Sequence, residues 1–240
     1  MGSEFTPTLI KDARHGYSRR MRKLIIFGAG QIAQVAHYYF SEDSDYEVTA
    51  FTVDAEFMNG DTAFGLPVLP FEDIESRLPP DGHDLFVAMG YGGVNRQRQD
   101  KAAAARGKGY LLAHYVSSRA WIWKGFEPRE NLFLLEDNTI QPFVEIGENT
   151  TLWSGNHIGH HSRIGDNVFI ASHVVISGAV TVGNNCFLGV NATVADNLTI
   201  GAHCVIGAGA VLTDNADERG VYPGKSSERA KIPSNRLRNF

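Results

Sequence analysis

Three of the nine histidines lie within five residues, in the stretch HIGHHSRIG that begins at His157. An imidazole can bind a metal ion, act as a general base near neutral pH, or belong to a solvated surface. His157, His160 and His161 therefore have three competing interpretations: a metal centre, a catalytic base with its neighbours, or polar surface residues. The choice depends on the backbone that positions them.

The backbone around these histidines repeats every six residues. From Ile140 to Leu212, each sixth residue is Ile, Leu or Val, thirteen in succession, and the phase is interrupted at Pro128. A period of six fits neither a helix nor a flat strand, but it fits a short strand followed by a sharp turn. Three such units close a triangular coil, and coils stack as parallel strands with the aliphatic residues inside. The pattern predicts a parallel β-helix of about five coils.

The chain before the repeat has a different pattern. KLIIFGAG and HDLFVAMG are apolar runs that end in glycine, and QIAQVAHYYF has helical spacing. Alternating strands and helices predict a small parallel sheet covered by helices. We divide the chain into an N-terminal extension with a cloning remnant (1–21), a Rossmann-like α/β domain (22–112), the β-helix (113–215) and a C-terminal tail (216–240).

Composition and charge exclude several classes of partner. The formal net charge is −5 and Lys and Arg are scattered, which argues against nucleic acid or an anionic membrane surface. No apolar run approaches the roughly 20 residues of a membrane span, and the N-terminus lacks the features of a secretory signal. Two cysteines in a chain of 240 residues predict a reduced, cytoplasmic protein. Cys186 and Cys204 fall at equivalent places in successive coils, which favours a stacked pair over a disulfide.

The metal interpretation does not fit the histidine spacing. γ-Class carbonic anhydrases are left-handed β-helices whose three zinc-binding histidines are separated by 36 and then 5 residues, and no two histidines of this chain have either separation. Neighbouring residues of one strand also face opposite ways, so His157, His160 and His161 cannot easily converge on one ion. We expect no metal site. For His157, His173 and His203 we expect solvated or stacked side chains.

His160 has neighbours that favour catalysis. One coil later, Gly178 stacks on His160 and Ala179 on His161, while Pro142 and Phe143 lie one coil earlier. The imidazole therefore has a packed floor and open space above it. Such a space, lined by bare backbone, is what a ligand needs to approach a titratable side chain.

The repeated aliphatic-Gly units behind IIFGAGQIAQV resemble the hexapeptide-repeat family of left-handed β-helix acyltransferases. Over residues 22–230 the arrangement resembles the bacterial nucleotide-sugar N- or O-acetyltransferases, including the bacillosamine and perosamine N-acetyltransferases and the sialic-acid O-acetyltransferase-like proteins. The resemblance implies left-handedness, a homotrimer with active sites between subunits, acetyl-CoA as acyl donor, and a nucleotide-linked amino sugar as acceptor. Within IGHHSRIG it selects His160 as general base, and His161 stands where relatives often carry an acidic residue.

The resemblance also implies a donor site. By the family pattern, the backbone at Gly178, Val190 and Ala208 would line the pantetheine arm of CoA, and the Gly178 N–H would stabilise the oxyanion. Lys225 is the one basic residue that we retain as a CoA phosphate contact. The alternative for Lys225 is a solvated tail.

The glycine loop of the front domain predicts a phosphate site. The pattern Gly28-x-Gly30 follows a strand and opens a helix, and Asp54 ends the next strand, where a carboxylate can bind a ribose hydroxyl. The domain is too short for a dinucleotide fold with a hydride-transfer site, and the resemblance implies a nucleotide sugar instead. We add three contacts from MGYGGVNRQR, with loop geometry and helix capping as the alternative: Gly90, Asn95 and Arg96.

These inferences predict an acetyl-CoA-dependent N-acetyltransferase for surface polysaccharide biosynthesis, with His160 as base. A sugar O-acetyltransferase is the first alternative. A β-helix that only organises an assembly is the non-enzymatic one.

Overall fold

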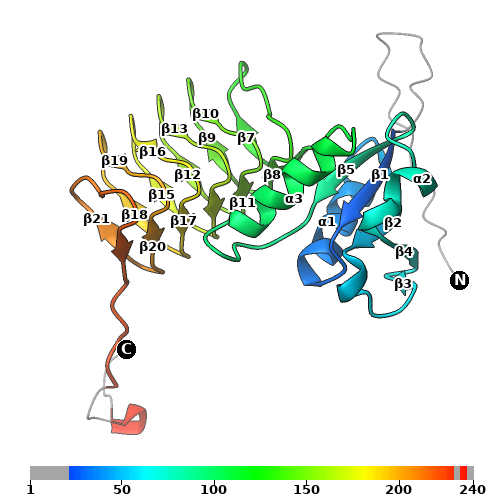
Figure 1. Ribbon diagram of the computed structural model, residues 1–240. Coiled ribbons are helices and arrows are strands. Elements are labelled where there is room, and N and C mark those ends of the chain that lie inside the picture. Colours follow the sequence, from blue (N-terminus) through cyan, green and yellow to red (C-terminus); the bar gives the residue numbers. More distant parts are fainter. Residues whose placement is uncertain (1–21, 230–232, 237–240) are drawn as a thin grey trace, which may run out of the picture.

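The computed structural model describes residues 22–229 and 233–236, so the predicted N-terminal extension lies outside the described residues. Figure 1 shows a small α/β domain beside the first coils of a long β-helix. This architecture, a Rossmann-like domain followed by a left-handed parallel β-helix, confirms the predicted fold class. No helix of the described residues is long and apolar enough to span a bilayer.

The α/β domain is built on a five-stranded sheet in the order β3-β4-β2-β1-β5. The pairs β1–β2, β1–β5 and β2–β4 are parallel, while the short edge strand β3 is antiparallel to β4, so the sheet is mixed rather than purely parallel. Its elements are β1 (Arg22–Phe27), α1 (Gln31–Glu42), β2 (Tyr46–Val53), β3 (Thr62–Ala63), β4 (Leu66–Pro70), α2 (Ile74–Arg77), β5 (His83–Val87) and α3 (Arg96–Gly107).

Both faces of this sheet are covered, which is why β1 is a continuous apolar run. Leu24 and Ile26 face α1 and are fully buried against Phe40. Ile25 faces the opposite side, in the cluster that contains Ala102 of α3. The carboxyl ends of β1, β2 and β5 therefore open on one edge of the domain, where the glycine loop lies.

The β-helix consists of two-residue strands that form three faces. The first face contains β6 (Tyr115–Val116), β8 (Phe133–Leu134), β11 (Thr151–Leu152), β14 (Phe169–Ile170), β17 (Phe187–Leu188), β20 (Val205–Ile206) and β22 (Val221–Tyr222). The second contains β7 (Trp121–Ile122), β9 (Thr139–Ile140), β12 (His157–Ile158), β15 (Val175–Ile176), β18 (Thr193–Val194) and β21 (Val211–Leu212). The third contains β10 (Glu145–Ile146), β13 (Arg163–Ile164), β16 (Thr181–Val182) and β19 (Thr199–Ile200).

Each strand pairs in parallel with the strand one coil away, so Leu152 lies beside Ile170 and Ile158 beside Ile176. All thirteen aliphatic residues of the repeat are buried, at 6% exposure or less. The second residue of a corner turn has left-handed φ, as at Asn149, Asn167 and Asn185. Asparagine tolerates this conformation better than most side chains.

The two cysteines lie inside the β-helix and are free. Their thiols contact backbone carbonyls, Cys186 Sγ to Gly201 O at 3.1 Å and Cys204 Sγ to Asp217 O at 3.0 Å. Burial raises the pKa of the Cys186 thiol to about 12, which leaves little reactive thiolate. They are the stacked pair that the sequence favours.

The β-helix continues beyond residue 215. Ala216 forms a parallel bridge with Ile200, and β22 pairs with β20. The last coil is shorter than the others, because Val205 pairs with Val221 only 16 residues later. The six-residue period of the sequence therefore ends before the last coil, but that coil still pairs with the one before it.

The front domain is anchored to the β-helix by a buried arginine. Arg98 of α3 is 1% exposed, and burial lowers the pKa of its guanidinium to about 9. It donates hydrogen bonds of 2.9 to 3.2 Å to the carbonyls of Gly90, Asn149, Asn167 and Val168 and to the Asn95 side chain. No carboxylate is among these partners. The arginine therefore ties α3 and the Gly90 loop to two successive coils, where Figure 1 shows α3 lying along the β-helix.

Candidate active site

His160 and His161 occupy the corner between the second and third faces, after β12 and before β13. Both side chains are exposed, and His161 has a φ of +60°. The corner is held by its neighbours: the His160 N–H donates to Gln141 Oε1 at 2.9 Å, and the His161 N–H donates to Pro142 O at 3.1 Å. The imidazoles are therefore accessible, while the backbone that carries them is fixed.

The two imidazoles face one another through their Nδ1 atoms, which are 3.1 Å apart. Only one proton fits between them, so one Nδ1 donates and the other accepts. If His160 donates, its Nε2 keeps a free lone pair and is available as a base. His161 is then the acceptor that fixes the tautomer of His160, a role that a carboxylate fills in other catalytic sites.

Gly178 lies directly above His160, but the space over it is partly filled. A Cβ at Gly178 would lie 2.6 Å from His160 Cε1 and 2.8 Å from Nε2, so the imidazole leans over the glycine. The absence of a side chain at Gly178 thus makes room for the His160 imidazole itself. The space above His160 is therefore smaller than the sequence analysis predicts. The Gly178 N–H makes no hydrogen bond within the described residues, so a donor is free beside Nε2.

The other predicted donor contacts lie across the second face. Val190 and Ala208 are exposed on the corner between the first and second faces, in the coils that follow Gly178. Lys225 is exposed after β22 and lines a cavity of about 450 Å³ at the C-terminal end of the β-helix, together with Gly209, Val211 and Tyr222. Of the predicted donor residues, Gly178 thus lies beside His160, Val190 and Ala208 lie on another corner, and Lys225 lies at the C-terminal end of the β-helix.

The glycine loop has the form of a phosphate site. Gly28 has a φ of +119°, and a Cβ there would lie 2.9 Å from Ala88 O. A Cβ at Gly90 would lie 3.3 Å from Ile32 Cδ1, while Gly30 at the start of α1 faces open space. The loop brings Gly28, Gly30 and Gly90 together at the helix N-terminus, where backbone N–H groups favour an anion.

Three charged residues lie at this edge. Asp54, after β2, accepts a 2.6 Å bond from Lys101 Nζ of α3, a residue that the sequence did not indicate. Both are partly exposed, so a ligand can still reach them. Arg96, at the first turn of α3, is 70% exposed and makes only a 3.3 Å pair with Asp100.

The predicted role of Asn95 is corrected by its environment. Asn95 is fully buried, its Nδ2 donates to Cys186 O at 2.9 Å, and its Oδ1 accepts from Arg98 Nη1 at 3.1 Å. Both polar ends of the side chain are engaged, so it joins the domain to the β-helix and has no group left for a nucleotide.

The remaining histidines do not gather around an ion. His157 lies on β12, His173 packs beside Gly155, and His203 occupies a separate corner. No group of three or more His, Cys, Asp or Glu side chains in residues 22–229 and 233–236 is placed to hold a metal.

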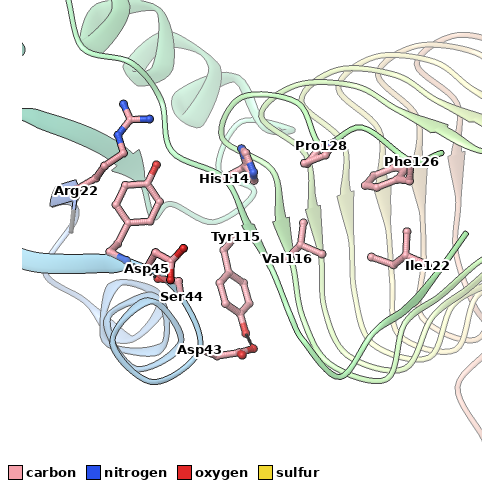
Figure 2. Close-up of a pocket in the computed structure, with 11 residues that line it drawn as sticks. Arg22, Asp43, Ser44, Asp45, His114, Tyr115, Val116, Ile122, Phe126 and Pro128 are labelled. Carbon is pink, nitrogen blue, oxygen red and sulfur yellow. Dashed lines mark hydrogen bonds between the residues drawn. The ribbon is translucent and has the colours of Figure 1, made fainter. Parts of the chain in front are cut away.

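Another cavity is lined by neither candidate site. It measures about 590 Å³ and lies between the α1–β2 connection and the first coil, with Arg22, Asp43, His114 and Phe126 in its lining. Figure 2 shows the Tyr115 hydroxyl directed at Asp43, with Val116 and Ile122 on the opposite wall. Neither His160 nor the glycine loop lines this cavity.

A family comparison agrees with this geometry. Residues 135–178 and 179–214 match the family described as bacterial transferase hexapeptide (six repeats). The match covers the regular coils of the β-helix, which is therefore similar to the β-helix of the bacterial hexapeptide transferases. The two matched segments include His160, His161 and Gly178, and they end close to the last residue of the aliphatic repeat.

Solved structures are similar to this chain over the front domain as well as over the β-helix. PerB from Caulobacter crescentus, in complex with CoA and GDP-perosamine, is 26% identical with a TM-score of 0.73, covering 84% of this chain and 94% of that one. The acetyltransferase domain of PglB from Neisseria gonorrhoeae is 21% identical with a TM-score of 0.74, covering 83% and 95%. WeeI from Acinetobacter baumannii is 21% identical with a TM-score of 0.71, covering 85% and 97%. No curated protein matched.

Proposed function

We propose that this chain is an acetyl-CoA-dependent N-acetyltransferase acting on the amino group of a nucleotide-linked amino-deoxy sugar, for surface polysaccharide biosynthesis. The observation that carries the proposal is that two groups lie side by side at one corner: the accessible His160 imidazole, and Gly178, whose N–H makes no hydrogen bond within the described residues. The likeness to PerB, which binds CoA and GDP-perosamine, supports the choice of donor and acceptor class.

The reaction is an acyl transfer. The amine nitrogen attacks the thioester carbonyl carbon, and the resulting oxyanion is stabilised by the Gly178 N–H. His160 Nε2 accepts a proton from the amine nitrogen and returns it to the departing sulfur as the carbon–sulfur bond breaks. An amide and free CoA are the products, and the imidazole ends in its starting state.

His161 supports this step as a positioning residue. By accepting the Nδ1–H of His160, it keeps Nε2 unprotonated before the reaction. A neutral imidazole stabilises the imidazolium of His160 less than a carboxylate would, so the base is suited to an amine, which becomes acidic on attack. This argument favours the amine over the hydroxyl of the O-acetyltransferase alternative.

The donor lies along the β-helix. Backbone at Gly178, Val190 and Ala208 lines the pantetheine arm, and Lys225 meets a CoA phosphate at the C-terminal cavity. The side chain of Lys225 is exposed and supplies a mobile positive charge, which is how lysine commonly contacts phosphate.

The acceptor nucleotide binds at the glycine edge of the front domain. Gly28, Gly30 and Gly90 receive the diphosphate, Asp54 meets a ribose hydroxyl, and Arg96 is free to contact the nucleotide. Lys101 lies beside Asp54 and adds a positive charge toward the diphosphate.

The proposed active site combines residues from more than one copy of the chain. In the early coils, the front domain contacts the two corners that flank the first face, through Arg98 to Asn149 O and Tyr39 to Glu136, whereas His160 occupies the remaining corner. This separation supports an acceptor that is bound by the front domain of a neighbouring copy. We propose a homotrimer with three such sites, and a cytoplasmic enzyme, since nucleotide sugars and acetyl-CoA are made there.

The test is a panel of UDP-, dTDP- and GDP-linked amino sugars incubated with acetyl-CoA, with thiol release and product mass as readouts. His160→Ala should lower the rate about 10²- to 10⁴-fold, the range of general base catalysis, with the assembly unchanged in light scattering. Full activity in His160→Ala would contradict the assignment. An alkali-labile product would indicate an ester and the O-acetyltransferase, and no turnover on any acceptor would favour the scaffold.

A further inference from the structure

The backbone N–H at a corner of the β-helix can be capped by a side chain from the next coil. At the corner that α3 covers, the Glu148 N–H donates to Asp166 Oδ1 at 3.0 Å, and the Asp166 N–H donates to Asn184 Oδ1 at 2.9 Å. Each donor stands directly before a left-handed residue, and each acceptor has the same place one coil later. Two successive N–H groups at this corner are therefore closed to a ligand.

Each of these caps depends on a glycine immediately before the donor. A Cβ at Gly147 would lie 2.3 Å from Asp166 Oδ1, and a Cβ at Gly165 would lie 2.3 Å from Asn184 Oδ1. Both separations are far shorter than a van der Waals contact, so a side chain at either glycine would displace the capping oxygen. The capping carboxylate or amide therefore occupies space that only a glycine leaves open.

The catalytic corner has the donor and the acceptor of such a cap, but not the glycine. Asp196 has the place of Gly178 one coil later, and the Asn197 N–H donates to Gly178 O at 2.9 Å, which establishes the register of the two coils. The residue before Gly178 is Ser177, which has a Cβ. The Asp196 carboxylate does not accept the Gly178 N–H, and its Oδ2 accepts from Asn197 Nδ2 at 2.5 Å instead.

We propose that Ser177 is a positioning residue that keeps the Gly178 N–H open for the thioester. Its Cβ fills the space that the capping side chains use at the other corner, so Asp196 is turned away from the N–H. A carboxylate on that N–H would compete with the developing oxyanion for the same donor and would repel its charge. This inference rests on the proposed function, in which the Gly178 N–H stabilises the oxyanion, and it assigns the residue that keeps this donor free.

The experiment gives the catalytic corner the missing glycine. In Ser177→Gly, Asp196 can cap the Gly178 N–H as Asp166 caps that of Glu148. Acetyl transfer must then break a hydrogen bond to a charged group before the oxyanion can use the donor, so we expect kcat/KM for acetyl-CoA to fall about 10- to 100-fold. Asp196→Ala in the same background removes the competing carboxylate and should restore most of the rate.

Two matched variants separate this effect from a general weakening of the coil. Ser177→Ala keeps the Cβ and should keep the rate of the natural chain; an equal loss in Ser177→Ala would assign the role to the hydroxyl and contradict the inference. Ala195→Gly makes the same kind of change one coil later, where Asp214 has the place of Asp196. It should leave kcat/KM unchanged, because the N–H that it opens to capping belongs to Asp196 and not to Gly178.

A crystal structure of Ser177→Gly gives a readout that does not depend on turnover. It should place an Asp196 carboxylate oxygen about 3 Å from the Gly178 nitrogen. An Asp196 side chain that stays on Asn197 would overturn the inference, as would full activity of Ser177→Gly or a loss that Asp196→Ala does not restore. If the natural chain turns over no acceptor while the crystal structure shows the cap, the proposed function fails and the exclusion of Asp196 by Ser177 stands.

Discussion

The corner that carries Asn149 and Asn167 and the corner that carries His160 and His161 belong to the same coils and have the same left-handed turn. At the first, α3 covers the turn, and Arg98 donates to the carbonyls of Asn149 and Asn167. At the second, no other element of the described residues covers the imidazoles, and one N–H stays unpaired. The six-residue repeat thus gives both corners the same backbone conformation. Whether the front domain packs on a corner decides whether that corner anchors the domain or stays exposed to solvent.

The largest effect should come from breaking the covered corner. Arg98→Met removes five hydrogen bonds and leaves buried carbonyls without donors, so the free energy of unfolding should fall by about 3 kcal/mol or more. Urea denaturation measures the loss. Arg96→Met, two residues earlier and 70% exposed, should change it by less than about 0.5 kcal/mol. Equal stabilities for the two variants would contradict the anchoring role.

The open corner should respond in activity rather than in stability. Gly178→Leu places a side chain where the His160 ring lies, so the imidazole must turn away and the donor must lose its approach. We expect kcat/KM to fall about 100-fold, comparable to removing an oxyanion donor, with acetyl-CoA affinity lost in calorimetry. Thr181→Ala, an exposed change in the next strand, is the control and should alter neither quantity.

A smaller effect is expected for the second imidazole. His161→Ala removes the acceptor that fixes the His160 tautomer, and kcat should fall about tenfold, a fraction of the effect of the base itself. His161→Glu restores an acceptor and should recover most of the loss. Nitrogen NMR of the His160 ring checks the cause, since Nε2 should be protonated more often in His161→Ala than in the natural chain. Identical tautomer populations would remove the positioning role.

The smallest effect concerns a carboxylate at the junction of the two regions. Burial would raise the pKa of Asp43, but the Ser118 N–H and the Tyr115 hydroxyl donate to the carboxylate and hold its pKa below the ordinary 3.8. The ionised form therefore stabilises the fold above that pH, and the contribution disappears as the pH falls through the folded-state pKa. Asp43→Asn should cost about 1 kcal/mol at pH 7 and much less at pH 2, measured by denaturation at both values. A cost that is equal at the two pH values would contradict the assignment.

The sequence predicts the β-helix well because its core is one-dimensional. Each inward position stacks on an equivalent one, so the aliphatic period from Ile140 to Leu212 determines strands, corners and core together. The period ends where the last coil shortens to 16 residues, which is why the predicted boundary at 215 falls before β22. The break at Pro128 likewise coincides with a first coil that has no strand between β7 and β8.

The site is predicted less completely, because its properties depend on contacts between distant residues. The stacking argument brings His160 and Gly178 together, but it does not reveal that the imidazole leans over the glycine. Asn95 resembles a loop residue in the sequence and is buried only because α3 docks on Cys186. The Lys101–Asp54 pair, 47 residues apart, follows from the same helix packing and has no local signal.

The anchoring of α3 has a consequence for how such a chain can vary. Arg98 and Asn95 grip the coils that contain residues 149, 167 and 186, and His160 lies within that span. Turns added or removed beyond Cys186 would leave the spacing between the front domain and His160 of the same chain untouched, while lengthening or shortening the part of the β-helix that carries Val190, Ala208 and Lys225, the donor contacts proposed above. The length of the proposed donor site can therefore change without altering the anchored coils that carry His160.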